Sequence, residues 1–335
     1  MKYVNRPHAR NLVAWAERRP EVLVLSADLT SSCEAEGFRA AYPERFFSFG
    51  LAEQNMVGFA SGLAREGFVP LVHTFAVFIC RRAFDQVAMS VAYSNLPVRF
   101  LGFLPGITTP GGATHQAIDD VGLMRLLPNM TVLDCGDATE VQSLLDAIES
   151  IPGPVYARVL RGEVPRLFEP DRPLRVGRAR LLREGGDLCL LSSGICTEEA
   201  LRGCEALVRR GLDVCHLHVS TLKPFDDPLL LELTSSARLG VVTIENHSVI
   251  GGLGSAMAER MAEVGLAKRL LRLGIQDQYA HGASRVYLAR KYGLDARALV
   301  SAAERLAGTS FDIEDGELES VDLQPIRSES RAEDL

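Results

Sequence analysis

Residues 46–67 read FFSFGLAEQNMVGFASGLAREG. A strand-type run, Phe46–Phe49, passes through Gly50 into an amphipathic helical pattern that is closed by Gly67. A short strand that feeds directly into a helix is the repeating unit of folds built on a parallel sheet. The same stretch places a carboxylate, Glu53, in the first turn of the helix. It therefore predicts a fold class and offers one candidate functional residue.

Strand-type runs alternate with helical patterns along the rest of the chain, which predicts an α/β fold with parallel sheets. Further strands are expected at Val22–Ser26, Pro70–Thr74, Val98–Leu104, Thr131–Cys135, Val155–Leu160, Leu188–Ser192, Val214–Val219, Leu239–Ile244 and Leu270–Leu273. We predict two doubly wound domains, 1–165 and 186–308, because a stretch rich in Pro and Arg interrupts the alternation. That stretch, 166–185, is predicted to be a linker, and an acidic tail follows at 309–335.

The composition is that of a soluble globular protein, with 47% hydrophobic and 24% charged residues and a formal net charge of −7. Nine acidic residues and two arginines lie between Phe311 and Leu335, so the rest of the chain is close to neutral. A neutral body offers no basic surface to nucleic acid. The acidic tail has few large apolar residues, and we expect it to be solvated and disordered.

The sequence shows neither an N-terminal secretion signal nor an apolar stretch long enough to cross a bilayer. The cysteines have no CxxC spacing, and most lie in apolar runs, so we expect reduced thiols in the core. They are Cys33, Cys80, Cys135, Cys189, Cys196, Cys204 and Cys215. These features predict a cytoplasmic protein that binds neither membranes nor nucleic acid.

Three segments carry side chains suited to chemistry, although each also has an ordinary structural explanation. The helix dipole favours a first-turn carboxylate such as Glu53. Aromatic residues three apart on a helix, such as Phe75 and Phe78, usually belong to the core. His115 lies in an irregular loop, Leu104–Gln116 (LPGITTPGGATHQ), where a lone histidine usually faces solvent. The loop follows a strand, however, at the sheet edge where open α/β folds bind ligands.

Together these segments resemble the pyrimidine-binding domain of transketolase and its relatives, and the likeness extends over residues 5–307. In that family a helix glutamate in an apolar pocket hydrogen-bonds N1′ of the aminopyrimidine of thiamine diphosphate and shares a proton with it. The resemblance implies this role for Glu53. It also implies that Phe75 and Phe78 flank the pyrimidine ring and that Asp28 contacts the cofactor.

The resemblance also implies where a sugar phosphate would bind. The run Thr114-His115-Gln116 matches a family motif whose histidine contacts the sugar near the reacting carbons. His115 is therefore a candidate for substrate contact and proton transfer. Arg10, Ser32 and Arg161 align with phosphate-contacting positions, and a guanidinium fork suits phosphate oxygens. An ordinary place on the surface is the alternative for both arginines.

The chain departs from classical transketolases at several positions. The third aromatic residue of their pyrimidine site is replaced by Arg81, and the run Arg82–Gln86 is closer to deoxyxylulose-phosphate synthases. A second histidine is replaced by Phe103, and an aspartate that recognises a substrate hydroxyl is replaced by Gly111. Losing polar groups changes which sugar a site accepts. These departures favour a less usual sugar phosphate, such as apulose 4-phosphate.

The glycine-rich run Ile244–Ser255 (IENHSVIGGLGS) links a strand to a helix, a pattern that also occurs at phosphate and dinucleotide sites. It resembles the C-terminal domain that transketolases share with E1β-type oxoacid dehydrogenase subunits. The resemblance implies a role in structure and in self-association through the C-terminal half, with no part in catalysis.

Enzymes of this family anchor the cofactor's diphosphate through Mg²⁺ bound to a Gly-Asp-Gly motif, and this sequence contains no such motif. The resemblance therefore implies that a separate N-terminal subunit carries the motif and the metal, in an α₂β₂ heterotetramer. The implied function is that of the C-terminal subunit of a split transketolase. This transferase would move a two-carbon ketol unit between sugar phosphates only together with its partner.

Two alternatives remain open. The first is a related enzyme subunit, either E1β-like or from a split deoxyxylulose-phosphate synthase, which would decarboxylate a 2-oxo acid. The second is a non-catalytic transketolase-like protein that only binds a partner. The His115 motif and the candidate phosphate contacts favour sugar chemistry over the first alternative. The presence of Glu53, Phe75 and His115 argues against the second.

Overall fold

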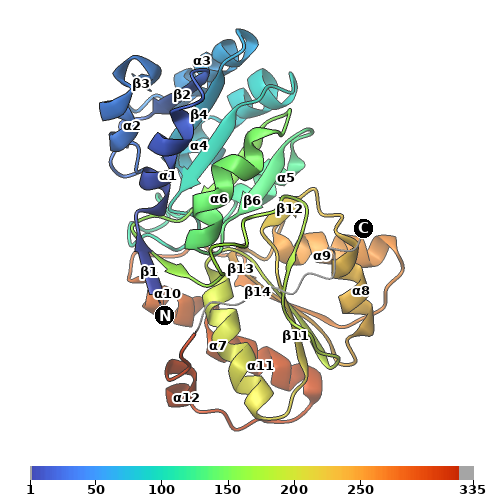
Figure 1. Cartoon of the computed structure of the whole chain (residues 1–335). Helices are drawn as coiled ribbons and strands as arrows, with labels where there is room; N and C mark the ends of the chain where they lie inside the picture. The colour runs from blue at the N-terminus through green and yellow to red at the C-terminus, as the bar shows by residue number, and fades with distance from the viewer. Residues whose placement is uncertain (1, 324–335) are drawn as a thin grey trace.

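The computed structural model describes residues 2–323. Within that range the strands form sheets of seven, five and two strands. Figure 1 shows α1–α6 gathered in one half of the molecule and α7–α12 in the other. The predicted α/β fold with two units is confirmed. No helix in the described part of the chain is long and apolar enough to cross a membrane.

The seven-stranded sheet of the first unit has the order β12-β6-β7-β5-β4-β2-β3. Its strands are β2 (Val22–Ser26), β3 (Phe46–Ser48), β4 (Val69–Phe75), β5 (Arg99–Phe103), β6 (Thr131–Asp134), β7 (Val155–Val159) and β12 (Thr221–Lys223). They run parallel except for β12, which pairs antiparallel with β6. β12 comes from the second half of the chain, so this sheet links the two units.

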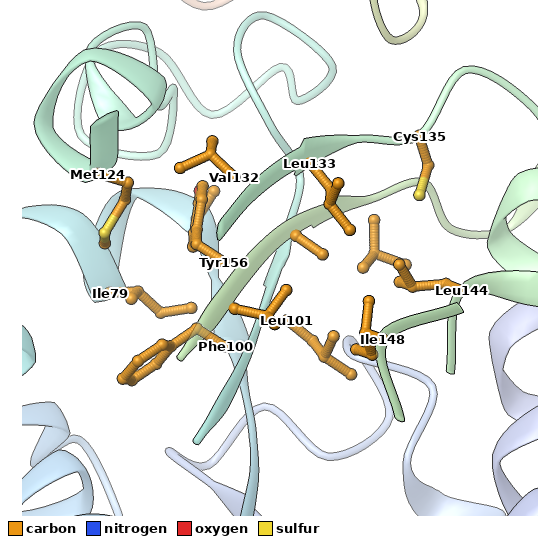
Figure 2. Packing of buried hydrophobic residues seen from close by; sticks show 14 of the residues in the cluster. Ile79, Phe100, Leu101, Met124, Val132, Leu133, Cys135, Leu144, Ile148 and Tyr156 are labelled. Carbon is orange, nitrogen blue, oxygen red and sulfur yellow. The ribbon is translucent and has the colours of Figure 1, made fainter. Parts of the chain in front are cut away.

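The helices of the first unit pack on both faces of its sheet. They are α1 (Pro7–Ala16), α2 (Glu36–Ala41), α3 (Glu53–Arg65), α4 (Ala76–Arg82), α5 (Asp120–Leu126) and α6 (Ala138–Glu149), with the 3₁₀ turn η1 (Pro43–Arg45) and the π-helical segment η2 (Gln86–Ala92). Because the sheet is covered on both sides, strands such as β2 are buried along their whole length. Figure 2 shows Leu101 of β5, Leu133 of β6 and Ile148 of α6 gathered in this core.

The five-stranded sheet of the second unit has the order β14-β13-β10-β11-β9. Its strands are β9 (Arg180–Arg183), β10 (Leu188–Ser192), β11 (Val214–His218), β13 (Gly240–Ser248) and β14 (Leu270–Ile275). Its helices are α7 (Cys196–Arg209), α8 (Pro228–Ser236), α9 (Leu253–Glu263), α10 (Arg285–Tyr292), α11 (Ala296–Ala307) and α12 (Asp315–Glu319). A short ribbon pairs β1 (Lys2–Asn5) with β8 (Glu163–Arg166).

Two predictions about the connecting segments need correction. The predicted linker, 166–185, contains β9, which pairs antiparallel with β11 and closes one edge of the second sheet. The first part of the predicted acidic tail contains α12, because Leu318, Val321 and Leu323 become buried. Residues 324–335 of that tail lie outside the described residues. The cysteines are free and buried, as predicted.

Buried charged groups join the two units. Arg158 on β7 is 1% exposed. It donates to Asp120 at 2.5 and 2.7 Å and to the main-chain oxygen of Asn246 at 3.1 Å. Glu140 on α6 accepts a hydrogen bond from Nε2 of His218 at 3.0 Å. Burial by itself would raise the pKa of Glu140, but His218 and other donors lower it well below its ordinary value. These pairs fix the second unit against the first.

The glycine-rich run of the second unit has a structural explanation. Glu245 at the end of β13 accepts hydrogen bonds from the main-chain nitrogens of Leu253 and Gly254, at 2.6 and 2.8 Å. A Cβ on Gly252 would lie 1.8 Å from this carboxylate, so only glycine fits there. The N-terminal donors of α9 are thus already bonded within the chain, which removes the phosphate or dinucleotide site as an interpretation.

Candidate functional site

Two aromatic side chains mark the carboxyl end of β4. Phe75 ends this strand and Phe78 lies one turn into α4, and their ring centroids are 5.7 Å apart with an interplanar angle of 27°. The ring of His115 packs edge-on against both, at 6.3 Å from Phe75 and 5.5 Å from Phe78. The structure therefore brings His115 to the aromatic pair, although the sequence placed them in separate motifs.

Glu53 lies at the same site. It is the first residue of α3 and is 2% exposed, and its Oε1 accepts a hydrogen bond from Nη1 of Arg82 at 2.9 Å. The guanidinium of Arg82 lies 3.9 Å from the centroid of the Phe78 ring. One arginine thus connects the buried carboxylate with the aromatic pair. Sequence reasoning missed this residue, although its position four residues after Phe78 places both on one face of α4.

The position of Arg82 tests whether these residues fit an aminopyrimidine. A guanidinium is a planar group whose edge donates N–H hydrogen bonds. Here it lies over an aromatic ring and donates to a buried carboxylate. An aminopyrimidine ring is also planar and would need the same two partners, so Glu53 and Phe78 fit that part of thiamine diphosphate. Among residues 2–323 no group of three or more His, Cys, Asp or Glu side chains could hold a metal ion.

The loop that carries His115 is held from two sides. Arg81 donates from Nη1 to the oxygen of Ala113 at 3.1 Å and from Nη2 to the oxygen of Gln116 at 3.3 Å. It also forms a bidentate pair with Asp119. From the second unit, the main-chain oxygen of His281 accepts a hydrogen bond from Nε2 of Gln116 at 3.2 Å. Sequence reasoning treated Arg81 only as a departure and missed Asp119 and His281.

Of the candidate phosphate contacts, Arg161 lies beside the aromatic pair. Nη1 of Arg161 donates to the main-chain oxygen of Ser32 at 3.0 Å, and its guanidinium carbon lies 6.0 Å from the Phe75 ring centroid. Glu34 accepts hydrogen bonds from the main-chain nitrogens of Ala9 at 3.2 Å and Gly162 at 2.7 Å. These contacts bring the segments containing Ser32 and Arg161 to the helix that carries Arg10, which is exposed.

Asp28 is less closely tied to the site. It is exposed and follows β2 with a φ of +58°, in the left-handed region that aspartate tolerates better than most residues. In the part of the chain that the structure describes, no hydrogen bond joins Asp28 to Glu53 or to the aromatic pair. Its predicted contact with the cofactor stays a prediction.

Two of the departures from classical transketolases, Phe103 and Gly111, have local explanations. Phe103 ends β5, where its ring packs 5.5 Å from the ring of His8 and 5.9 Å from that of His73. Phe103 and His73 are both fully buried, so both are core residues. Burial also lowers the pKa of His73 to about 4. Gly111 lies against His115, and a Cβ at this glycine would come within 2.9 Å of Cβ of the histidine. Any larger residue would push the histidine aside.

Comparisons with known proteins agree with this arrangement. Residues 8–166 match the transketolase pyrimidine-binding domain, and residues 177–299 match the transketolase C-terminal domain. A transketolase family protein from Sinorhizobium fredii is 40% identical over 298 residues, which cover 88% of this chain and 86% of the relative. A 6-deoxy-6-sulfo-D-fructose transketolase subunit from a Clostridium species is 40% identical over 297 residues, covering 88% and 91% of the two chains.

A solved structure is similar over nearly the whole chain. It is described as a split-gene transketolase in an inactive β4 tetramer. The two chains are 39% identical and superimpose with a TM-score of 0.81, over 91% of this chain and 97% of the other.

Proposed function

This chain belongs to the transketolase family, and we propose that it is the C-terminal subunit of a split transketolase that transfers a two-carbon ketol unit between sugar phosphates. The observation that carries the proposal is the meeting of Glu53, Phe75, Phe78 and His115 in one site. The buried carboxylate and the aromatic faces suit the aminopyrimidine of thiamine diphosphate, and the histidine lies beside them.

Each residue has a defined task in this proposal. Bound thiamine diphosphate supplies the nucleophilic carbon, which is chemistry that no side chain provides. Glu53, which is buried, would hydrogen-bond N1′ of the aminopyrimidine and share a proton with it. Phe75 and Phe78 present flat apolar faces to the ring. His115 contacts the sugar near the reacting carbons and moves a proton there.

Phosphate recognition falls to the edge formed by Arg161, Ser32 and Arg10. Arg161 donates one hydrogen bond to the main-chain oxygen of Ser32, and this bond orients its guanidinium. The remaining donors of the fork can meet phosphate oxygens in pairs. Arg161→Ala should therefore raise KM for phosphorylated sugars and leave KM for their unphosphorylated forms nearly unchanged. An equal rise for both would remove its phosphate role.

The other half of the active site is proposed to come from a separate N-terminal subunit. That partner would carry the Gly-Asp-Gly motif, bind Mg²⁺ and hold the cofactor's diphosphate, in a cytoplasmic α₂β₂ assembly. Two observations support this arrangement. The sequence lacks the motif, and the similar split-gene transketolase is described as inactive in a tetramer of β chains alone.

The substrate is proposed to be a less usual ketose with an anionic end, such as apulose 4-phosphate. Classical transketolases have polar side chains where this chain has Phe103 and Gly111, and the loss of both polar groups supports a change of sugar. One relative at 40% identity is named for a sulfonated fructose, which supports an unusual sugar for this chain as well. A screen of ketose phosphates and sulfonates against aldose acceptors would identify the pair.

A split deoxyxylulose-phosphate synthase is the second candidate, favoured by the run Arg82–Gln86. This enzyme would consume pyruvate and release CO₂, whereas a transketolase would need a ketose donor. Supplying pyruvate with an aldose phosphate and measuring CO₂ separates the two activities.

Thiamine diphosphate binding tests the central proposal. Calorimetry with Mg²⁺ should show tight binding only when this chain is mixed with its N-terminal partner. Glu53→Gln keeps the shape of the side chain but cannot share a proton in the same way, so it should abolish ketol transfer in the assembled enzyme. Full activity in that variant, or in Glu53→Ala, would show that the assignment of Glu53 is wrong.

A further inference from the structure

We infer that Arg81 is a positioning residue that holds His115 beside the aromatic pair. The inference rests on the proposed function, because it assigns a task within the ketol-transfer site. Arg81 stands where classical transketolases have an aromatic residue, so the family pattern does not explain it. The explanation comes from its contacts with the loop that carries His115.

The guanidinium of Arg81 grips the main chain on both sides of His115. Its Nη1 bonds the oxygen of Ala113 at 3.1 Å, two residues before the histidine, and its Nη2 bonds the oxygen of Gln116 at 3.3 Å, one residue after it. Asp119, at the start of α5, holds the same guanidinium at 3.0 Å through Nε and through Nη2. A planar fork with five donors can bridge these points, whereas a lysine ammonium cannot.

His115 depends on this support because its own side-chain contacts are weak. Nδ1 lies 2.9 Å from the hydroxyl of Thr114, which is exposed, and the ring touches Phe75 and Phe78 only by its edge. The preceding Gly111 and Gly112 give the loop wide conformational freedom, and Gly112 has a φ of +72°. The direction of the imidazole is therefore set by the main chain of the loop.

The loop is also anchored at its base, so Arg81 controls its tip. Gln116 binds the oxygens of Thr109 and His281, and Asn246 of the second unit binds the nitrogen of Ile107. Without Arg81 the base would stay in place while the segment around His115 gained freedom. A shift of about 1 Å in a reacting group costs up to about a hundredfold in rate.

Arg81→Ala in the assembled enzyme should lower kcat about 10- to 100-fold and leave thiamine diphosphate affinity within about twofold. Added guanidinium ion at tens of millimolar should restore part of the rate, since it can occupy the vacated fork, and equal ammonium should not. The kcat of Arg81→Lys should be lower than the kcat of Arg81→Ala measured with added guanidinium. Arg125→Ala is the matched control, because Arg125 also bonds two carbonyls and a carboxylate, at Gly251, Gly252 and Glu259.

A second readout needs no activity. Amide hydrogen exchange of the free chain should become faster at residues 111–116 in Arg81→Ala. In the wild-type structure this segment contains a hydrogen bond from the nitrogen of His115 to the oxygen of Gly112. Exchange there should stay unchanged in Arg125→Ala. If the wild-type assembly lacks ketol transfer but the exchange result holds, the proposed function fails and the positioning of His115 stands. Unchanged exchange, undiminished turnover, or a rate loss that guanidinium does not rescue would overturn the inference.

Discussion

Replacing Arg82 with alanine would leave the carboxylate of Glu53 buried without its guanidinium. Breaking a fully buried ion pair costs about 3–5 kcal/mol. Here Glu53 is 2% exposed but Arg82 is 49% exposed, so solvent already screens one partner. The contact between Arg82 and the face of Phe78 contributes about 0.5–1 kcal/mol more at an exposed site. We therefore expect Arg82→Ala to destabilise the isolated chain by about 1–2 kcal/mol.

Thermal unfolding of the isolated chain measures this effect. A loss of 1–2 kcal/mol corresponds to a fall in midpoint of about 2–8 °C for a chain with domains of this size. Arg209→Ala is the control, because Arg209 pairs with Glu205 on the surface of α7 with both side chains about half exposed. Such pairs contribute well under about 1 kcal/mol. Equal midpoints for Arg82→Ala and wild type would show that Glu53 and Arg82 are not paired in solution.

The same variant also tests whether Arg82 competes with thiamine diphosphate for Glu53 and Phe78. Its guanidinium holds the two partners that an aminopyrimidine ring would need, so binding must displace it. Removing a competing interaction of about 1.4 kcal/mol raises affinity about tenfold. Calorimetry on the assembled enzyme should therefore show tighter thiamine diphosphate binding by Arg82→Ala. Weaker binding would refute this reasoning and make Arg82 a direct cofactor contact.

Four further predictions concern the fold that supports the site. Gly106→Ala should cost about 2–4 kcal/mol by thermal unfolding, because its Cβ would lie 2.2 Å from Oδ1 of Asn246 at a φ of +55°. Gly58→Ala in α3 meets open space and should be neutral or stabilising by up to about 1 kcal/mol. Burial lowers the pKa of His73 to about 4, so this histidine stays neutral in the fold while the unfolded form takes up a proton below about pH 6.5. Stability is therefore lost as pH falls from about 6.5 to about 4. His73→Gln should reduce that slope by up to about 1.4 kcal/mol per pH unit in urea titrations. Glu140→Gln should cost about 3–5 kcal/mol at pH 7, because the buried Glu140 carboxylate pairs with Arg180 at 3.0 Å. A change below about 1 kcal/mol would show that this buried ion pair does not stabilise the fold.

Most strands could be predicted because their apolar runs are continuous and have sharp ends. Val22–Ser26 and Leu188–Ser192 form β2 and β10 with the predicted bounds. The sequence did not predict β9 and β12, because RLLR and TLK are too short to show a pattern. Both strands are stabilised by pairing with a strand that is distant in the sequence, β11 and β6 respectively.

The sequence by itself determined the fold class, the family and the kinds of side chain available for chemistry. Glu53, Phe75 and His115 could be chosen because each belongs to a motif of a few residues, and local spacing determines which element carries it. Only the tertiary structure decided their partners. Arg82 reaches Glu53 across 29 positions in the chain, and Arg81 reaches Ala113 and Asp119 across 32 and 38. Such contacts depend on how the edge of the sheet brings separate loops together, and no local pattern records that arrangement.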